Sequence, residues 1–226
     1  FIIVMGRTAH NAPIQKWTAR MAINSFDASY KTSKCFWGSK PHAIIKEILN
    51  FKRSGDVLDL GVGEGRDALF LAKNGFSVTG VDISETGIQK FKNFAKDANL
   101  SVKGIVSNIE DFTFDKKYDV ILSMVTLHFL QEKQVKDIIK KIKQNTNQNG
   151  LNAIMVFTNK FGPNKFPCLF KENELKEIYE DWEILHYSEI NVNMKLKDDS
   201  GNPIKKSAAI ILAKKYRNKN KEELAL

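Results

Sequence analysis

Three glycines spaced two residues apart form the segment of this sequence that is best suited to bind a ligand. The segment lies between a short apolar run and a helical pattern, and reads Asp59-Leu60-Gly61-Val62-Gly63-Glu64-Gly65. Glycine has no Cβ, so a ligand can lie close to the backbone amides, and the N-terminus of the following helix adds a positive partial charge. The segment therefore predicts a ligand-binding turn between a strand and a helix.

The spacing of the glycines differs from the dinucleotide-binding pattern Gly-x-Gly-x-x-Gly. The third glycine comes one residue early, and Asp59 stands two residues before the first. This acidic residue favours a ligand with an ammonium group over one with a pyrophosphate. S-adenosylmethionine carries such a group, so we expect it to be the cofactor, with Asp59, Gly61, Gly63 and Gly65 near its methionine portion. For the glycine pattern alone, an ordinary tight turn is the alternative.

Further polar residues follow the next three apolar runs. Asp82 ends the second run, where a carboxylate can accept both hydroxyls of a ribose, although capping of the next helix is an alternative role. With its neighbour Ile83, it is a candidate cofactor-binding residue. After the third run, Asn108 is placed to bind the exocyclic amine of adenine and Ile109 to pack on its ring. Ser123, at the end of the fourth run, is expected to border the pocket on the methyl-donor side.

The sequence resembles the class I S-adenosylmethionine-dependent methyltransferases. Three segments carry this resemblance: residues 57–67, 80–82 and 118–123. Within the class the chain is most similar to the tellurite-resistance branch, or TehB type. Five further segments carry that similarity: residues 65–75, 112–115, 170–175, 201–205 and 212–215. The resemblance covers about residues 40 to 215 and implies an enzyme that uses S-adenosyl-L-methionine.

The sequence departs from the family pattern in two places, one near the expected adenine and one in the last hairpin. The class usually has Asp where this chain has Asn108, which still offers a side-chain oxygen to adenine. The branch carries a His-Arg pair and a further Arg in its last hairpin, where this chain has Lys195, Leu196 and Ser207. Lys195 is therefore a candidate substrate residue, but the oxyanion chemistry of the branch does not transfer to this chain.

Methyl transfer from a sulfonium depends mainly on holding the nucleophile in line and keeping water out. A thiolate, selenide or reduced tellurium species attacks unaided, whereas an oxygen or nitrogen nucleophile often needs a base. His128 is the candidate base, because it follows the fourth apolar run and histidine titrates near neutral pH. Packing beside Leu127 and Phe129 is the competing interpretation of this residue.

An aromatic segment precedes the expected methyltransferase domain. Tyr30, Phe36 and Trp37 are candidates for a lid that shields the sulfonium through cation–π attraction, and core packing is the alternative. The two cysteines, Cys35 and Cys168, indicate neither a disulfide framework nor a metal site, and Cys168 is interpreted as a structural thiol.

Short apolar runs alternate with helical patterns from residue 56 onward, which is typical of a parallel sheet covered by helices on both faces. We expect a Rossmann-like, doubly wound, mostly parallel α/β sheet of seven strands with a C-terminal antiparallel hairpin. The expected strands are residues 57–60, 77–81, 102–106, 118–123, 152–157, 182–194 and 208–213. The expected helices are residues 66–73, 85–98, 132–144 and 172–180, with another that has Pro41 in its first turn and Ser39 as its cap.

The chain of 226 residues is expected to form a single core. Residues 1–38 are interpreted as an N-terminal extension or lid, 39–215 as the methyltransferase domain and 216–226 as a charged tail. Residues 26–37 are expected to form a loop, and Asn149-Gly150 the turn before the fifth strand. No signal peptide or membrane span is recognised, so a cytoplasmic protein is expected.

The net charge of +9 raises nucleic acid as a partner. Only five of the 35 basic residues are arginine, the residue favoured for phosphate and base contacts, so this partner is the less favoured one. Residues 123–126 also lack the Asn/Asp-Pro-Pro-aromatic element of amino-group nucleic-acid methylases. The leading hypothesis is therefore a methyltransferase that acts on a small molecule, with a chalcogen or another soft nucleophile such as a thiol as acceptor. An RNA or protein methyltransferase and a non-catalytic nucleotide-binding module are the alternatives.

Overall fold

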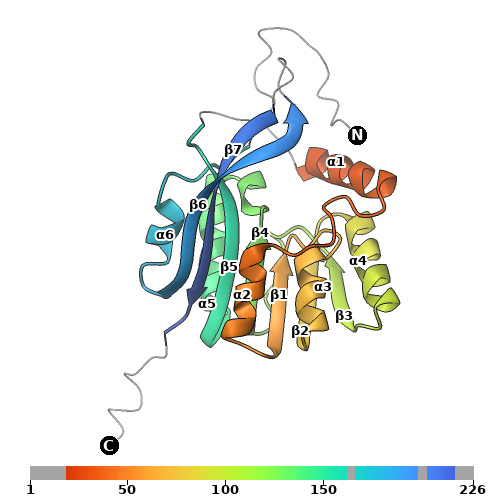
Figure 1. Ribbon diagram of the computed structural model, residues 1–226, viewed down its shortest axis with the longest axis horizontal. Helices are drawn as coiled ribbons and strands as arrows, with labels where there is room; N and C mark the ends of the chain where they lie inside the picture. Colours follow the sequence, from red (N-terminus) through yellow and green to blue (C-terminus); the bar gives the residue numbers. More distant parts are fainter. Residues whose placement is uncertain (1–18, 162–165, 198–202, 217–226) are drawn as a thin grey trace, which may run out of the picture.

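The computed structural model describes residues 19–161, 166–197 and 203–216, and its strands form one seven-stranded sheet (Figure 1). The order across the sheet is β3-β2-β1-β4-β5-β7-β6. Five strands are parallel, and β7 runs antiparallel between β5 and β6. This arrangement confirms the expected doubly wound sheet with a C-terminal hairpin. The strands are β1 (Gly55–Leu60), β2 (Phe76–Asp82), β3 (Val102–Val106), β4 (Tyr118–Met124), β5 (Thr146–Thr158), β6 (Glu183–Lys197) and β7 (Pro203–Lys214).

Helices cover both faces of the sheet because neighbouring strand residues are buried on opposite sides. Val57 packs with the helices of one face and Leu58 with those of the other. The first face carries α2 (Ala43–Glu47), α3 (Arg66–Lys73) and α4 (Glu85–Asp97), with the 3-10 helix η1 (Ile48–Asn50). The second face carries α5 (Glu132–Gln144) and α6 (Glu174–Ile178).

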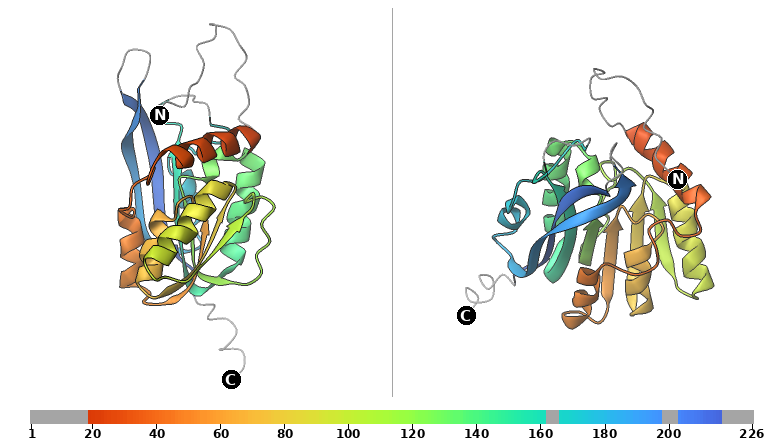
Figure 2. Two further views of the ribbon diagram at one scale, coloured as in Figure 1. Left: turned by 90° about the vertical axis from the view of Figure 1, so that its right-hand side faces the viewer. Right: turned by 45° about the horizontal axis from the view of Figure 1, so that its top comes forward.

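The carboxyl ends of the parallel strands meet at one edge of the sheet. The glycine turn follows β1 there, Asp82 ends β2, and the 3-10 helix η2 (Leu127–Phe129) follows β4. Helix α1 (Ala19–Thr32) lies above this edge in both figures and contacts α4 (Figures 1 and 2). The edge covered by α1 is therefore where a ligand of this fold is expected to bind.

Two local expectations at the N-terminal side are wrong. The segment 26–32, expected to be part of a loop, is the second half of α1, because it packs against α4, a contact that local patterns do not reveal. Helix α2 begins at Ala43 with His42 as its N-cap, so Pro41 precedes the helix and Ser39 does not cap it. The carboxylate of Asp67 accepts the His42 amide instead, at 2.8 Å.

Strand β5 begins six residues earlier than expected. Asn149 has φ of +58°, as an Asn-Gly turn predicts, but the chain stays in the sheet on both sides of it. The register between β4 and β5 shifts between Tyr118 and Val120, so the turn residues form an irregularity inside the strand. Helix α6 is shorter at both ends than expected, and the two hairpin strands are longer.

No helix in the described ranges is both long and apolar enough to cross a membrane. In the same part of the chain, no group of three His, Cys, Asp or Glu residues could hold a metal ion. Residues 1–18 of the expected lid and 217–226 of the expected tail lie outside the described residues.

Candidate functional site

The glycine turn is tightly packed against the rest of the protein. Gly61, Gly63 and Gly65 all have positive φ, of +87°, +53° and +87°. A Cβ at Gly61 would overlap Thr126, one at Gly63 would lie 2.7 Å from the Tyr30 hydroxyl, and one at Gly65 would overlap Phe91. Glycine is therefore needed at these positions because protein atoms occupy the space of a Cβ. From the sequence, that space was expected to hold a ligand.

Three buried carboxyl groups surround this turn. Asp59 is 3% exposed, Asp67 6% and Asp82 8%. Burial, followed by the charges of Asp67 and Asp82, raises the pKa of Asp59 well above its ordinary value. Burial also raises the pKa of Asp82, against the opposing effect of three backbone hydrogen bonds, from Ser84, Gly63 and Ile83. A cation placed among these groups would be strongly stabilised.

Asp82 links the ends of β1 and β2. Its carboxylate accepts the Gly63 amide at 2.7 Å and the Ser84 amide at 2.9 Å. Ser84 is the N-cap of α4, and its hydroxyl accepts the Gly87 amide at 2.9 Å, so capping is not the role of Asp82. With a third backbone hydrogen bond from Ile83, the carboxylate still has a lone pair that can accept from a ribose hydroxyl.

The other expected cofactor residues lie near the same edge. Asn108 donates its side-chain amide to Glu110 at 2.8 Å, and the neighbouring Ser107 amide donates to the Asp82 carbonyl at 2.9 Å. Ile109 is buried and Ile83 is half-buried. The hydroxyl of Ser123 is buried and donates to the Leu60 carbonyl at 3.3 Å, so it joins β4 to β1.

His128 lies fully buried among aromatic rings. Its ring centroid is 4.5 Å from that of Phe129, 4.3 Å from Phe157 and 4.6 Å from Phe166. Neither ring nitrogen has a hydrogen-bond partner among the described residues. Burial, with a smaller effect of the Lys206 charge, lowers its pKa to about 3. The packing interpretation fits these contacts, and a role as base remains a hypothesis.

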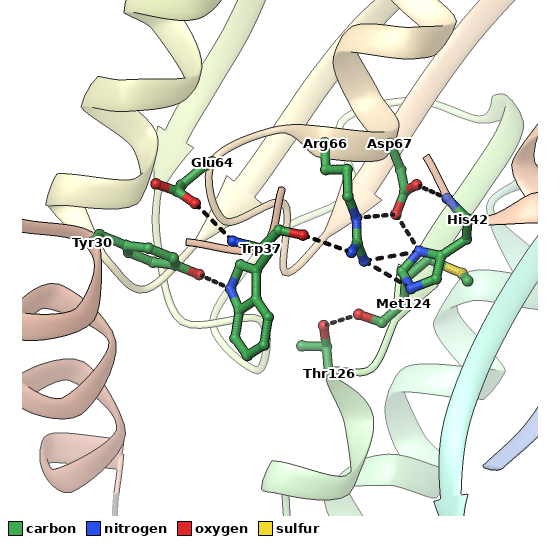
Figure 3. Close-up of polar contacts among 8 residues, drawn as sticks. All are labelled: Tyr30, Trp37, His42, Glu64, Arg66, Asp67, Met124 and Thr126. Atoms are coloured by element: carbon green, nitrogen blue, oxygen red, sulfur yellow. Dashed lines mark hydrogen bonds and ion pairs between the residues drawn. The ribbon is translucent and has the colours of Figure 1, made fainter. Parts of the chain in front are cut away.

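The aromatic segment that follows α1 is bound to the glycine turn (Figure 3). Glu64, inside the turn, accepts the Phe36 amide at 2.7 Å and pairs with Lys90 at 2.5 Å. The Trp37 indole donates to the Tyr30 hydroxyl at 3.2 Å, and burial raises the pKa of Tyr30. The segment therefore lies directly over the turn, and its role as a lid stays a prediction.

A cluster of charged residues that the sequence argument missed lies beside the same turn (Figure 3). The Nδ1 atom of His42 is 2.7 Å from a carboxylate oxygen of Asp67. One terminal nitrogen of Arg66 lies 2.7 and 3.0 Å from the two ring nitrogens of His42, and the other donates to the Trp37 carbonyl at 3.1 Å. The only sequence signal was that Arg66 and Asp67 directly follow the third glycine; His42 is too distant in the sequence to be linked with them.

Two predicted residues remain, Lys195 and Cys168. Lys195 falls within β6, and its side chain lies outside the described residues. Cys168 is buried in the core on the second face of the sheet, and burial raises the pKa of its thiol to about 11. The prediction of a structural thiol fits this environment.

Comparisons with known proteins agree with this fold. A family model described as "Tellurite resistance protein TehB" matches residues 26–212. The probable S-adenosyl-L-methionine-dependent methyltransferase TehB of Haemophilus influenzae is 38% identical over 162 residues, which cover 70% of this chain and 57% of that protein. The crystal structure of TehB from Haemophilus influenzae matches with a TM-score of 0.72 at 33% identity, covering 85% of this chain and 66% of that one.

A more distant relative is a ubiquinone biosynthesis O-methyltransferase of Rickettsia akari. It is 33% identical over 92 residues, which cover 40% of this chain and 37% of that protein. This chain thus spans less than two thirds of the length of each of these relatives.

Proposed function

Because this chain belongs to the family of the tellurite resistance protein TehB, we propose that it transfers the methyl group of S-adenosyl-L-methionine to a small molecule. The observation that carries this proposal is the cluster of buried carboxyl groups around the glycine turn, at the carboxyl ends of β1 and β2. A buried carboxyl with a raised pKa suits a cationic ligand, because a nearby positive charge stabilises its ionised form.

The proposed cofactor site uses the residues at the carboxyl ends of β1 to β4. In it Asp59 lies beside the ammonium group, Asp82 accepts from the ribose and Asn108 binds the adenine. When bound, the cofactor supplies an electrophilic methyl group on a positively charged sulfur. The residues assigned to this site are Asp59, Gly61, Gly63, Gly65, Asp82, Ile83, Asn108, Ile109 and Ser123.

The closed N-terminal segment supports a small acceptor. Tyr30 and Trp37 lie over the glycine turn, and Glu64 and Lys90 hold this segment in place. A cover of this kind excludes water from the reacting sulfur and limits the size of the acceptor. Tyr30, Trp37 and Lys195 are therefore the proposed acceptor-side residues.

The proposed acceptor is a soft nucleophile, such as a thiol or a reduced chalcogen. His128 is a weak proton acceptor at neutral pH because burial lowers its pKa to about 3. A soft nucleophile needs no such base, whereas an oxygen acceptor, as the name of the ubiquinone biosynthesis O-methyltransferase indicates for that relative, would often need one.

An RNA or protein acceptor receives less support, because one cluster of four lysines lies away from the glycine turn. Lys136, Lys140, Lys143 and Lys215 line an apolar groove of about 430 Å³ beside Trp182. Lys215 donates to the carbonyl of Thr146, the first residue of β5, so this groove extends to the edge where the parallel strands begin. The glycine turn is at the opposite edge.

An acceptor screen tests this proposal. The chain is incubated with methyl-labelled S-adenosylmethionine and, in separate reactions, thiols, selenite or tellurite with a thiol reductant, phenols, small amines and bulk RNA. We expect label to reach a thiol or a reduced chalcogen, with RNA at the background set by a reaction without the chain. Transfer to RNA or protein with none to a small molecule would reject the small-molecule acceptor.

A further inference from the structure

Lys206 is a half-buried lysine near the start of β7. Its Nζ atom lies 5.7 Å from the centre of the Phe166 ring, and within the described ranges it has no ion-pair or hydrogen-bond partner. Burial lowers the pKa of this ammonium group, and no described carboxylate opposes that effect. Lys90 and Lys143, by contrast, each pair with a carboxylate at 2.5 Å. A partly desolvated cation without a counterion attracts an anion.

The ring beside this lysine belongs to a row of aromatic side chains. The aromatic row consists of Phe26 of α1, Phe129 of η2 and Phe166. The ring centroids of Phe166 and Phe129 are 5.2 Å apart, and those of Phe129 and Phe26 are also 5.2 Å apart. All three residues are half-buried, so the row keeps some surface that a ligand can contact.

The aromatic row leads to the proposed cofactor site. Phe26 stacks on Tyr30 at 6.3 Å between ring centroids, and the Tyr30 hydroxyl lies beside Gly63. Thr126, the residue before η2, occupies the space beside Gly61. The row therefore borders the proposed cofactor site on the side of β4, with the unpaired lysine at its far end.

The charge at this far end comes from Lys206. The described titratable group that faces it is His128 of η2, which is neutral near pH 7 because its pKa is about 3. Val192 stands opposite on β6, and the exposed Lys205 lies on the other face of β7. An acceptor with an anionic sulfur and a flat apolar body suits this arrangement, since the sulfur can contact the ammonium group while the body packs on the rings.

We propose that Lys206 binds the nucleophile of the acceptor as an anion, that the aromatic row packs against its apolar body, and that the acceptor is therefore an aromatic thiol. This inference rests on the proposed function, because it names the class of acceptor at the same site. The thiol gives its proton to solvent on binding, and Lys206 stabilises the thiolate that remains. The thiolate sulfur then bonds to the methyl carbon as the carbon–sulfonium bond breaks, and the electron pair of that bond stays on the sulfur of S-adenosylhomocysteine.

Steady-state methylation by the whole chain tests this with benzenethiol and hydrosulfide, which has the anionic sulfur without the apolar body. Lys206→Met should raise the KM for both acceptors about 10-fold at pH 8, through loss of a charged contact. It should also move the acidic limb of the kcat profile upward by about one pH unit, because kcat reports the bound thiol. The limb of kcat/KM, which reports the free thiol, should stay in place. Lys206→Arg should keep most of the unmodified behaviour.

A matched control is Lys205→Met, which makes the same change at the exposed neighbouring residue. It should leave both KM values and the kcat profile unchanged. Phe166→Leu should raise the KM for benzenethiol by about 5-fold while the KM for hydrosulfide changes little. Thermal unfolding and calorimetry with S-adenosylmethionine check each variant, and Lys206→Gln replaces Lys206→Met if the latter does not fold.

Unchanged kinetics in the Lys206 variants, or the same loss in Lys205→Met, would overturn the inference while the proposed function stands. Weaker cofactor binding in Lys206→Met would also overturn it, because the lysine would then support the cofactor site. An equal change in both KM values with Phe166→Leu would overturn the aromatic acceptor. Methyl transfer to reduced selenite but to neither sulfur acceptor would reject the inference alone. Transfer to no small molecule would reject the proposed function and the inference with it.

Discussion

Asp59 is the residue at which stability and the proposed function conflict most clearly. Burial and two neighbouring carboxyl groups raise its folded-state pKa above the ordinary 3.8. A raised pKa means that its contribution to stability is present below pH 3.8 and is lost as the pH rises through the folded-state pKa. At neutral pH the group therefore favours unfolding unless a cation lies beside it.

Asp59→Asn should accordingly raise the melting temperature of the cofactor-free chain at pH 8, because it removes a carboxyl that is costly to ionise. It should also weaken S-adenosylmethionine binding by about 1 to 3 kcal/mol, through loss of a charged acceptor. Melting curves and calorimetry measure the two effects. A lower melting temperature, or unchanged cofactor affinity, would show that Asp59 has been misinterpreted.

His128 gives a pH-dependent prediction of the opposite sign. Its pKa falls from 6.5 to about 3 in the folded chain, so the unfolded chain binds an extra proton between these values. Stability is present above pH 6.5 and is lost as the pH falls. Relative to His128→Phe, the unmodified chain should lose about 2 kcal/mol between pH 7 and pH 5 in urea unfolding.

The same variant also addresses the role of His128 in catalysis. His128→Phe should retain methyl transfer to a thiol, since the buried imidazole is a poor base at neutral pH. Loss of transfer with cofactor binding intact would restore His128 as the base. Equal loss of stability in both proteins on acidification would instead mean that the imidazole is accessible to protons.

Sequence reasoning found the residues of the proposed cofactor site that follow strands, because each strand end is marked by a change from apolar to polar residues. It missed His42 and the link between Glu64 and Lys90, which depend on contacts across helices. Its reason for the glycines was also incomplete, since Thr126, Tyr30 and Phe91 occupy the space beside them.

At the level of helices and strands, one ion pair fixes the N-terminal segment. It joins Lys90 of α4 to Glu64 of the glycine turn. The Lys90 side chain is 18% exposed and that of Glu64 is 2% exposed, and Lys90 also binds two carbonyls of the segment. Removing one partner leaves a buried charge without compensation, which is more costly than removing both.

Lys90→Met should therefore destabilise the chain by about 3 kcal/mol, and adding Glu64→Gln should restore a large part of that loss. Amide hydrogen exchange should accelerate mainly in residues 30–37 while β1 and β2 stay protected. Lys96→Met, at an exposed position of the same helix, is the matched control. Uniform acceleration throughout the sheet would show that the pair supports the whole fold rather than this segment.

The elements that sequence patterns predicted well are those with a local sequence signal. Strand β3 and helix α3 have the predicted bounds, because a short run rich in β-branched residues marks the strand and the helical apolar pattern marks the helix. The second half of α1 was missed because its helix depends on packing against α4. The start of β5 was missed because an Asn-Gly pair that usually ends a strand is accommodated by a register shift.

At the scale of the whole molecule, one cluster of lysines lies away from the proposed active site. The lysine groove follows α5 and reaches the edge where the parallel strands begin, whereas the buried acidic cluster lies where they end. A net charge of +9 therefore does not by itself indicate a polyanionic acceptor at the glycine turn.

Calorimetric titration of the whole chain with S-adenosylmethionine, S-adenosylhomocysteine and NAD tests the central claim most directly. The acidic cluster and the glycine spacing predict that both S-adenosyl ligands bind, with dissociation constants of roughly micromolar order, and that NAD does not. Binding of NAD without binding of S-adenosylmethionine, or binding of none of the three, would contradict the account.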